Sequence, residues 1–276
     1  MRAVLVLLFL AVSVAAEPRL RVVEDTDLWQ RMIHKLSGPE AVASAQTTDA
    51  QRAWATLIRQ RATQWESEIP ALAANYAPIP APALATIVVG NGGGQDAFTH
   101  DATTIGFDVA RLHAEYGDAT LAENAGRIDR FFRHEYTHLL QKAWLREHPY
   151  AASTPLRAAL LGMWTEGLGN YYSLSEKWRG VTNAEIEPRM VARLAALACA
   201  SDEDAAKLLA DLSMGRFDRK WGALPVALWL AADPGAIREL VLAGPDGIWP
   251  LAERHLPDGS RAILREARAA AAMCER

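Results

Sequence analysis

The sequence predicts an α+β fold that is mostly α-helical, with a small antiparallel or mixed sheet placed ahead of a central pair of helices. The pair is indicated by apolar side chains at helical spacing in residues 121–147 and again after Thr154. Two short β-branched runs, residues 83–89 and 103–109, indicate the sheet. Apolar residues at helical spacing before and after these segments predict that most of the remaining chain is helical as well.

The chain divides into four expected segments. Residues 1–16 form a signal peptide, and residues 17–79 form an N-terminal helical region that ends in a proline-rich stretch. Residues 80–178 hold the strands and the helix pair, and residues 179–276 form a C-terminal helical region. Capping residues and periodicity predict helices in this last region at 183–200, 201–213, 225–232, 234–242 and from 257 onward.

The first residues have the pattern of a secretory signal. Arg2 precedes an apolar run from Ala3 to Val14, and Ala16 supplies the small residue before a cleavage site. The run is too short to span a bilayer as a helix, although a retained anchor is the alternative interpretation. No other long apolar stretch follows. We therefore expect an exported chain, periplasmic or secreted, with no transmembrane segment after cleavage near Ala16.

Composition limits the classes of partner. The formal net charge is −4, which is mildly acidic and gives no support for nucleic-acid binding. Half of the residues are hydrophobic, and a chain of 276 residues with this composition can bury a sizeable core. The glycine cluster at residues 90–94 lacks the Gly-Lys-Ser/Thr ending of a phosphate-binding loop, so we do not expect a nucleotide there.

Two cysteines, Cys199 and Cys274, are the only ones in the chain. Outside the cytoplasm such a pair can form a disulfide, which would tie the last segment to the preceding helices. Two free buried thiols are the alternative, and neither cysteine is a candidate catalytic residue.

Residues His134, Glu135 and His138 form the motif His-Glu-x-x-His within the first helix of the pair. Histidines four apart lie about 40° apart around a helix, so both imidazoles can reach one metal ion from the same face. Imidazole nitrogen suits zinc, and a carboxylate beside a zinc-bound water can accept the proton of that water. The motif predicts metal-assisted hydrolysis with Glu135 as general base. The alternative is that the motif occurs here by chance, in which case His134 and His138 are half-buried helix residues and Glu135 is a solvated charge.

A third protein ligand is needed to complete a catalytic zinc site of the usual kind. The metzincin pattern would place another histidine six residues beyond His138, where this chain has Trp144. The next candidate is Glu166. Thr154 as N-cap and Pro155 at the first position begin a second helix, which would return antiparallel and bring Glu166 beside the histidines.

With this spacing the chain resembles the gluzincin group of zinc metallopeptidases, over about 40 residues. The resemblance rests on His-Glu-x-x-His, on a glutamate in a later helix, and on the small and aromatic residues that follow Glu166. It implies that residues 80–178 are a zincin-like catalytic core with His134, His138 and Glu166 as ligands of Zn²⁺. It also implies that Glu135 is the general base, that the sheet forms a wall beside the substrate, and that the substrate is a peptide or protein. A plain flexible hairpin loop is the alternative to such a wall.

The chain departs from the gluzincin pattern at Asn170. Some gluzincins have an aspartate four residues after the ligand glutamate, and the Asn170 carbonyl would replace it as hydrogen-bond acceptor for a ligand histidine. The donor that stabilises the oxyanion is not assigned by sequence. Tyr171, Tyr172 and His255 are the candidates, and for the two tyrosines packing roles are the commoner alternative.

Two functions from different classes follow. The first is an exported zinc metallopeptidase. The second is a secreted binding or scaffold protein that keeps a peptidase-like fold with a structural zinc or with none. Metal content and chelator-sensitive cleavage of peptides would separate them.

Overall fold

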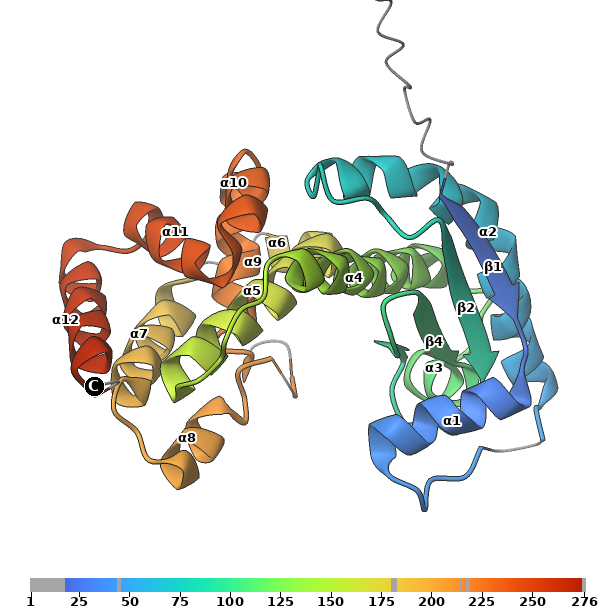
Figure 1. The fold of residues 1–276 in the computed structure, drawn as a ribbon. Helices are drawn as coiled ribbons and strands as arrows, with labels where there is room; N and C mark the ends of the chain where they lie inside the picture. Colours follow the sequence, from blue (N-terminus) through green and yellow to red (C-terminus); the bar gives the residue numbers. More distant parts are fainter. Residues whose placement is uncertain (1–17, 44–45, 180–182, 214, 217–218, 275–276) are drawn as a thin grey trace, which may run out of the picture.

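The computed structural model describes residues 18–43, 46–179, 183–213, 215–216 and 219–274. The predicted signal peptide, residues 1–16, lies outside the described residues. The protein is mostly helical with a small mixed sheet and a helical C-terminal region, so the predicted fold class is confirmed. Helix α4 lies in the middle, with the sheet and α1–α3 on one side and α7–α12 on the other (Figure 1).

The sheet has four strands in the order β1-β2-β4-β3. The predicted strands are β2 (Leu84–Gly90) and β4 (Thr104–Asp108), which pair in parallel. Two strands were missed by the sequence analysis: β1 (Arg19–Val23), parallel to β2, and β3 (Ala97–Thr99), antiparallel to β4. The three-residue length of β3 is too short to produce a pattern, and β1 adds a strand to a region expected to be only helical.

The two faces of the sheet are covered by different helices. Val88 of β2 packs with Trp29 and Met32 of α1 (Thr26–Ser37), whereas its neighbours Ile87 and Val89 belong to the main core. This alternation follows from the two-residue period of a strand. The second face lies against α2 (Asp49–Ala74) and α4, and α3 (Val109–Tyr116) follows β4 directly.

Aromatic rings join α2, the sheet and α4 on that second face. The Trp65 ring of α2 stacks on Phe107 of β4 at 5.7 Å and on Phe132 of α4 at 4.7 Å between ring centroids. All three side chains are fully buried. Their stacking fixes how α4 lies across the sheet, and α4 carries the His-Glu-x-x-His motif.

The predicted helix pair is present with the expected boundaries. Helix α4 spans Ala122–Glu147, and α5 spans Pro155–Ser173. Thr154 is the N-cap of α5, because its side chain accepts a hydrogen bond from the Arg157 amide. The glycine cluster after β2 has a structural role. The Gly92 and Gly94 amides donate hydrogen bonds to the Asp108 carboxylate at 3.1 and 2.8 Å, which holds this connector against the end of β4.

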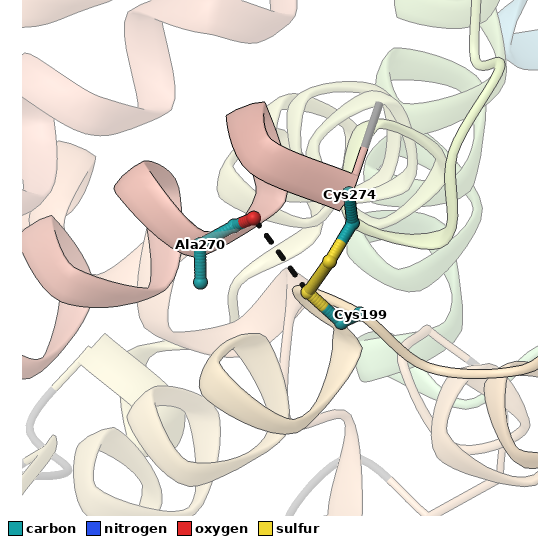
Figure 2. Close-up of a disulfide and its surroundings, with 3 residues drawn as sticks. All are labelled: Cys199, Ala270 and Cys274. Atoms are coloured by element: carbon teal, nitrogen blue, oxygen red, sulfur yellow. Dashed lines mark hydrogen bonds between the residues drawn. A yellow bond between two sulfur atoms is a disulfide. The ribbon is translucent and has the colours of Figure 1, made fainter. Parts of the chain in front are cut away.

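The C-terminal region packs against α5 and closes with a disulfide. Val226 of α9 lies where a Cβ on Gly167 of α5 would be, so these two helices approach closely. Cys199, just after α7, and Cys274, in the last turn of α12, are joined with their Cα atoms 5.9 Å apart (Figure 2). The described α-helices and 3-10 helices (η) after α5 are α6 (Glu176–Arg179), η1 (Asn183–Glu185), α7 (Ile186–Leu197), α8 (Asp202–Leu209), α9 (Ala223–Ala232), α10 (Ala236–Ala243), η3 (Gly244–Gly247), α11 (Ile248–His255) and α12 (Asp258–Cys274).

In this region the observed start of a helix agrees with the predicted start where a capping residue marks it. The Ser201 side chain accepts a hydrogen bond from the Asp204 amide and begins α8, as the capping pattern predicted. Helices α3 and α11 were not predicted. Within the described part of the chain, no helix is both long and apolar enough to cross a bilayer.

Candidate metal centre

Helix α4 brings His134, Glu135 and His138 together within one turn. The histidine rings lie edge to face, and their Nε2 atoms are 3.0 Å apart. Ligand atoms of all three side chains lie within 4.8 Å of one another. This group could hold a metal ion.

Glu166 of α5 faces the same point from the second helix. Its Oε2 atom is 3.6 Å from His134 Nε2, and its Oε1 atom is 3.7 Å from His138 Nε2. The antiparallel return of α5 therefore places the carboxylate where the sequence analysis expected it. All three side chains are largely buried, with 15%, 11% and 28% of the side chain exposed for His134, His138 and Glu166.

Each histidine uses its other ring nitrogen for a hydrogen-bond contact. His138 Nδ1 lies 2.8 Å from Gln141 Oε1, and His134 Nδ1 lies 3.4 Å from Ser173 Oγ. The sequence analysis expected Asn170 in this role. Among the described residues, neither ring is hydrogen-bonded to Asn170, and the Asn170 side-chain nitrogen is buried with no partner. Gln141 and Ser173 hold the positions that were assigned to it.

The carboxylates and imidazoles of the site shift each other's pKa values. Burial alone would raise the pKa of Glu166, but its interactions with His134 and His138 lower it to about 2. Burial would lower the pKa of His134, but Glu166 and Glu135 raise it above its usual value. The Glu166 carboxylate and the His134 imidazole therefore stabilise each other's charged forms.

The donor set fits a zinc ion. Ligand atoms about 2.0–2.1 Å from zinc at tetrahedral angles are about 3.3 Å apart. The Nε2 atoms are 3.0 Å apart and the carboxylate oxygens are 3.6 and 3.7 Å from them, so small adjustments would suffice. Two imidazoles and one carboxylate are a ligand set that catalytic zinc sites use.

Glu135 is oriented by a strand of the sheet. Its side chain is 8% exposed, and its Oε2 atom accepts a hydrogen bond from the Thr99 hydroxyl at 2.8 Å. Thr99 is the last residue of β3, so the edge strand and the motif helix meet at this carboxylate. The Thr99 hydroxyl therefore restrains one oxygen of the Glu135 carboxylate.

Sequence analysis also missed Lys220, which precedes α9. Burial lowers the pKa of Lys220, while the charges of Glu166 and Glu135 raise it. Its ammonium group therefore lies in the field of both carboxylates. None of Thr99, Gln141 and Lys220 belongs to a local motif, which explains why they were missed. Thr99 and Lys220 come from segments distant in sequence, and Gln141, although one turn after His138, is distinguished only by its hydrogen bonds to α5.

The three candidate oxyanion donors make contacts outside the group of His134, Glu135 and His138. Tyr172 Oη accepts a hydrogen bond from Asn75 at 3.1 Å, and burial raises its pKa to about 12. His255 stacks on Trp229, in the C-terminal region. The Tyr171 ring packs edge to face on Tyr172. None of these three is hydrogen-bonded to a motif residue in the part of the chain that is described.

Comparisons of the chain with known protein families, with characterised proteins and with solved structures found no match. A function for this site therefore has to be inferred from the geometry of its residues.

Proposed function

We propose that this protein is a zinc metallopeptidase of the gluzincin type, with His134, His138 and Glu166 as metal ligands and Glu135 as general base. The observation that carries the proposal is the convergence of two Nε2 atoms and a carboxylate from a second helix, with another carboxylate beside them. A bound zinc ion would supply Lewis acidity toward a water molecule and a substrate carbonyl.

Glu135 would accept the proton of the attacking water and later transfer it to the leaving amine. Its position supports this role, because it is buried beside the histidines and Thr99 restrains one of its oxygens. Glu166 and the histidines would remain in place during the reaction. Lys220 adds a positive charge close to the two carboxylates.

Strand β3 supports a peptide as the substrate. It is the last strand in the sheet order, and it is antiparallel to β4. Asp96 and His100 make hydrogen bonds to β4, so the alternation of an antiparallel ladder turns the backbone of Ala97 and Thr99 toward the opposite edge. There the Thr99 carbonyl accepts a hydrogen bond from Lys142 at 3.4 Å, which an added strand would have to replace. An extended peptide could add to this edge as a further strand and pass beside Glu135.

Export is part of the same proposal. Cleavage after Ala16 would leave Glu17 and Pro18 before β1, so the sheet would be complete in the mature chain. The Cys199–Cys274 disulfide is typical of an oxidising compartment. Sequencing the N-terminus of the protein recovered from outside the cytoplasm tests this; a mature chain that begins after Val23 would contradict it.

The enzyme proposal is tested with Glu135→Gln. We expect this variant to bind zinc as the unaltered protein does and to lose peptide hydrolysis by at least about 100-fold, because the proton acceptor is gone while the ligands remain. Zinc per chain is measured by elemental analysis, and hydrolysis with a mixed peptide library.

His138→Ala and a chelator provide the controls. Both should remove zinc and hydrolysis together. A chain that binds zinc but cleaves no peptide would favour the structural-zinc alternative, and full hydrolysis by Glu135→Gln would refute the role of the base.

A further inference from the structure

Gln141 connects the two helices that carry the candidate ligands. It lies on α4, one turn after His138, and is 1% exposed. Its Nε2 atom donates to the main-chain carbonyl oxygens of Trp164 and Thr165 on α5, at 3.2 and 3.0 Å. These two residues directly precede Glu166 in the sequence.

The two carbonyl contacts fix the orientation of the amide. A carbonyl oxygen can only accept a hydrogen bond, so the nitrogen of the Gln141 amide must be the atom that faces α5. Its oxygen then faces His138 Nδ1 at 2.8 Å and must accept a hydrogen bond from it. His138 therefore carries a proton on Nδ1.

A neutral imidazole with a proton on Nδ1 has its lone pair on Nε2. The Nε2 atom of His138 is the one that faces His134 and Glu166. Gln141 thus holds His138 in the tautomer that can bind a metal, and the same amide ties it to the turn of α5 that carries Glu166. The contact of His134 with Ser173 also joins α4 to α5, but it is longer, at 3.4 Å, and it reaches the end of α5 and not the turn that carries Glu166.

We propose that Gln141 is a positioning residue of the metal centre, which sets the tautomer of His138 and the approach of Glu166 before metal binds. This inference rests on the proposed zinc site. It assigns to a neutral amide the role that a carboxylate has in many histidine–zinc sites.

Gln141→Met is the test, because it keeps a long side chain but removes all three hydrogen bonds. We expect the zinc dissociation constant to rise about 10- to 100-fold, as for other changes in the groups that orient metal ligands. We also expect His138 in the metal-free protein to lose its preference for the Nδ1-protonated tautomer. Zinc binding is measured by competition with a coloured chelator, and the tautomer by ¹⁵N NMR of the imidazole at about pH 8.

Asn124→Leu is a matched control on the same helix. Asn124 is fully buried, and its amide also donates to two main-chain carbonyls, those of Tyr116 and Asp118, while its oxygen accepts from Arg127. Its loss should lower the melting temperature much as Gln141→Met does, but should leave zinc affinity and the His138 tautomer unchanged.

The outcomes separate this inference from the enzyme proposal. Unchanged zinc affinity and an unchanged tautomer in Gln141→Met would overturn the positioning role while leaving the zinc site intact. Equal weakening of zinc binding by Asn124→Leu would overturn it too, since general loss of stability would then be the cause. If the unaltered protein bound no zinc, the enzyme proposal would fail, and the tautomer measurement in the two variants would still decide the role of Gln141.

Discussion

At the scale of single residues, Gly169 makes room for a candidate ligand. A Cβ atom at this position would lie 2.9–3.1 Å from three atoms of the His134 ring. Those distances are too short for ordinary contact, so the ring would have to move. Gly169 is therefore required by the position of His134 on the neighbouring helix, and not by the backbone of α5.

Gly169→Ala should weaken zinc binding by about tenfold or more, because a displaced ring no longer points its Nε2 atom at the other ligands. Gly126→Ala on α4 is the control, since a Cβ there meets only Arg130 Nη1 at 3.6 Å. The control should raise stability by up to about 1 kcal/mol and leave zinc affinity unchanged. Zinc competition and thermal unfolding measure both effects; equal zinc affinity in the two variants would contradict this account of Gly169.

At the scale of elements, α2 is joined to α4 by two ion pairs. Arg61 makes a two-pronged contact with Asp129, at 2.9 and 2.6 Å, and the Trp65 indole donates to the same carboxylate at 2.7 Å. Arg133, next to the motif, makes a similar contact with Glu68. These pairs hold the motif helix against α2 on the side away from the metal site.

Asp129→Asn should lower the free energy of unfolding by about 2 kcal/mol, because the Arg61 charge would remain in a partly buried place with a weaker partner. The Asp49–Arg52 pair at the start of α2 is exposed, so Asp49→Asn should change stability by no more than about 0.5 kcal/mol. Denaturant unfolding of both variants is the measurement. Equal effects would show that burial does not matter to these pairs.

The Glu68–Arg133 pair predicts a dependence of stability on pH. Burial would raise the pKa of Glu68, but hydrogen bonds from Arg133 and Gln64 lower it below the usual value. A carboxyl whose pKa is lower in the folded state stabilises the fold above its unfolded pKa, about 4.3, and this stabilisation is lost as the pH falls through the folded pKa. Glu68→Gln should therefore flatten the loss of stability below about pH 4.3 in acid unfolding. An identical pH profile would refute this role.

At the scale of the whole molecule, the candidate site draws on two of the expected segments, residues 80–178 and residues 179–276. The candidate ligands lie on α4 and α5, Thr99 comes from the sheet, and Lys220 comes from the segment before α9. The disulfide lies between α7 and α12, which pack on each other outside this group.

Replacing both cysteines by serine should lower stability by about 2–4 kcal/mol, because the bridge closes a loop of 75 residues and restricts the unfolded chain. Zinc content below the melting temperature should not change, since no ligand lies on α7 or α12. Thermal unfolding and elemental analysis test the two statements. Loss of zinc from the still-folded variant would contradict the separation of bridge and site.

The sequence by itself determined the local features. The caps Thr154 and Ser201, the ends of α4 and the placement of two histidines on one face all depend on residues within a few positions of each other, so their signals lie in short stretches. Even the approach of Glu166 was accessible, because a short connection between helices leaves an antiparallel return as the simplest arrangement.

Only the tertiary structure decided which groups orient those ligands and how the sheet is completed. Strand β3 is too short to have a period, and β1 is defined by its pairing with β2. Thr99 acts through a hydrogen bond to Glu135, 36 positions away, and Gln141 joins the nearby His138 to main-chain carbonyls 23 and 24 positions away. Such bonds depend on the packing of α4 against α5 and the sheet, and a neutral amide or hydroxyl has the same local appearance in a sequence whether or not it makes them.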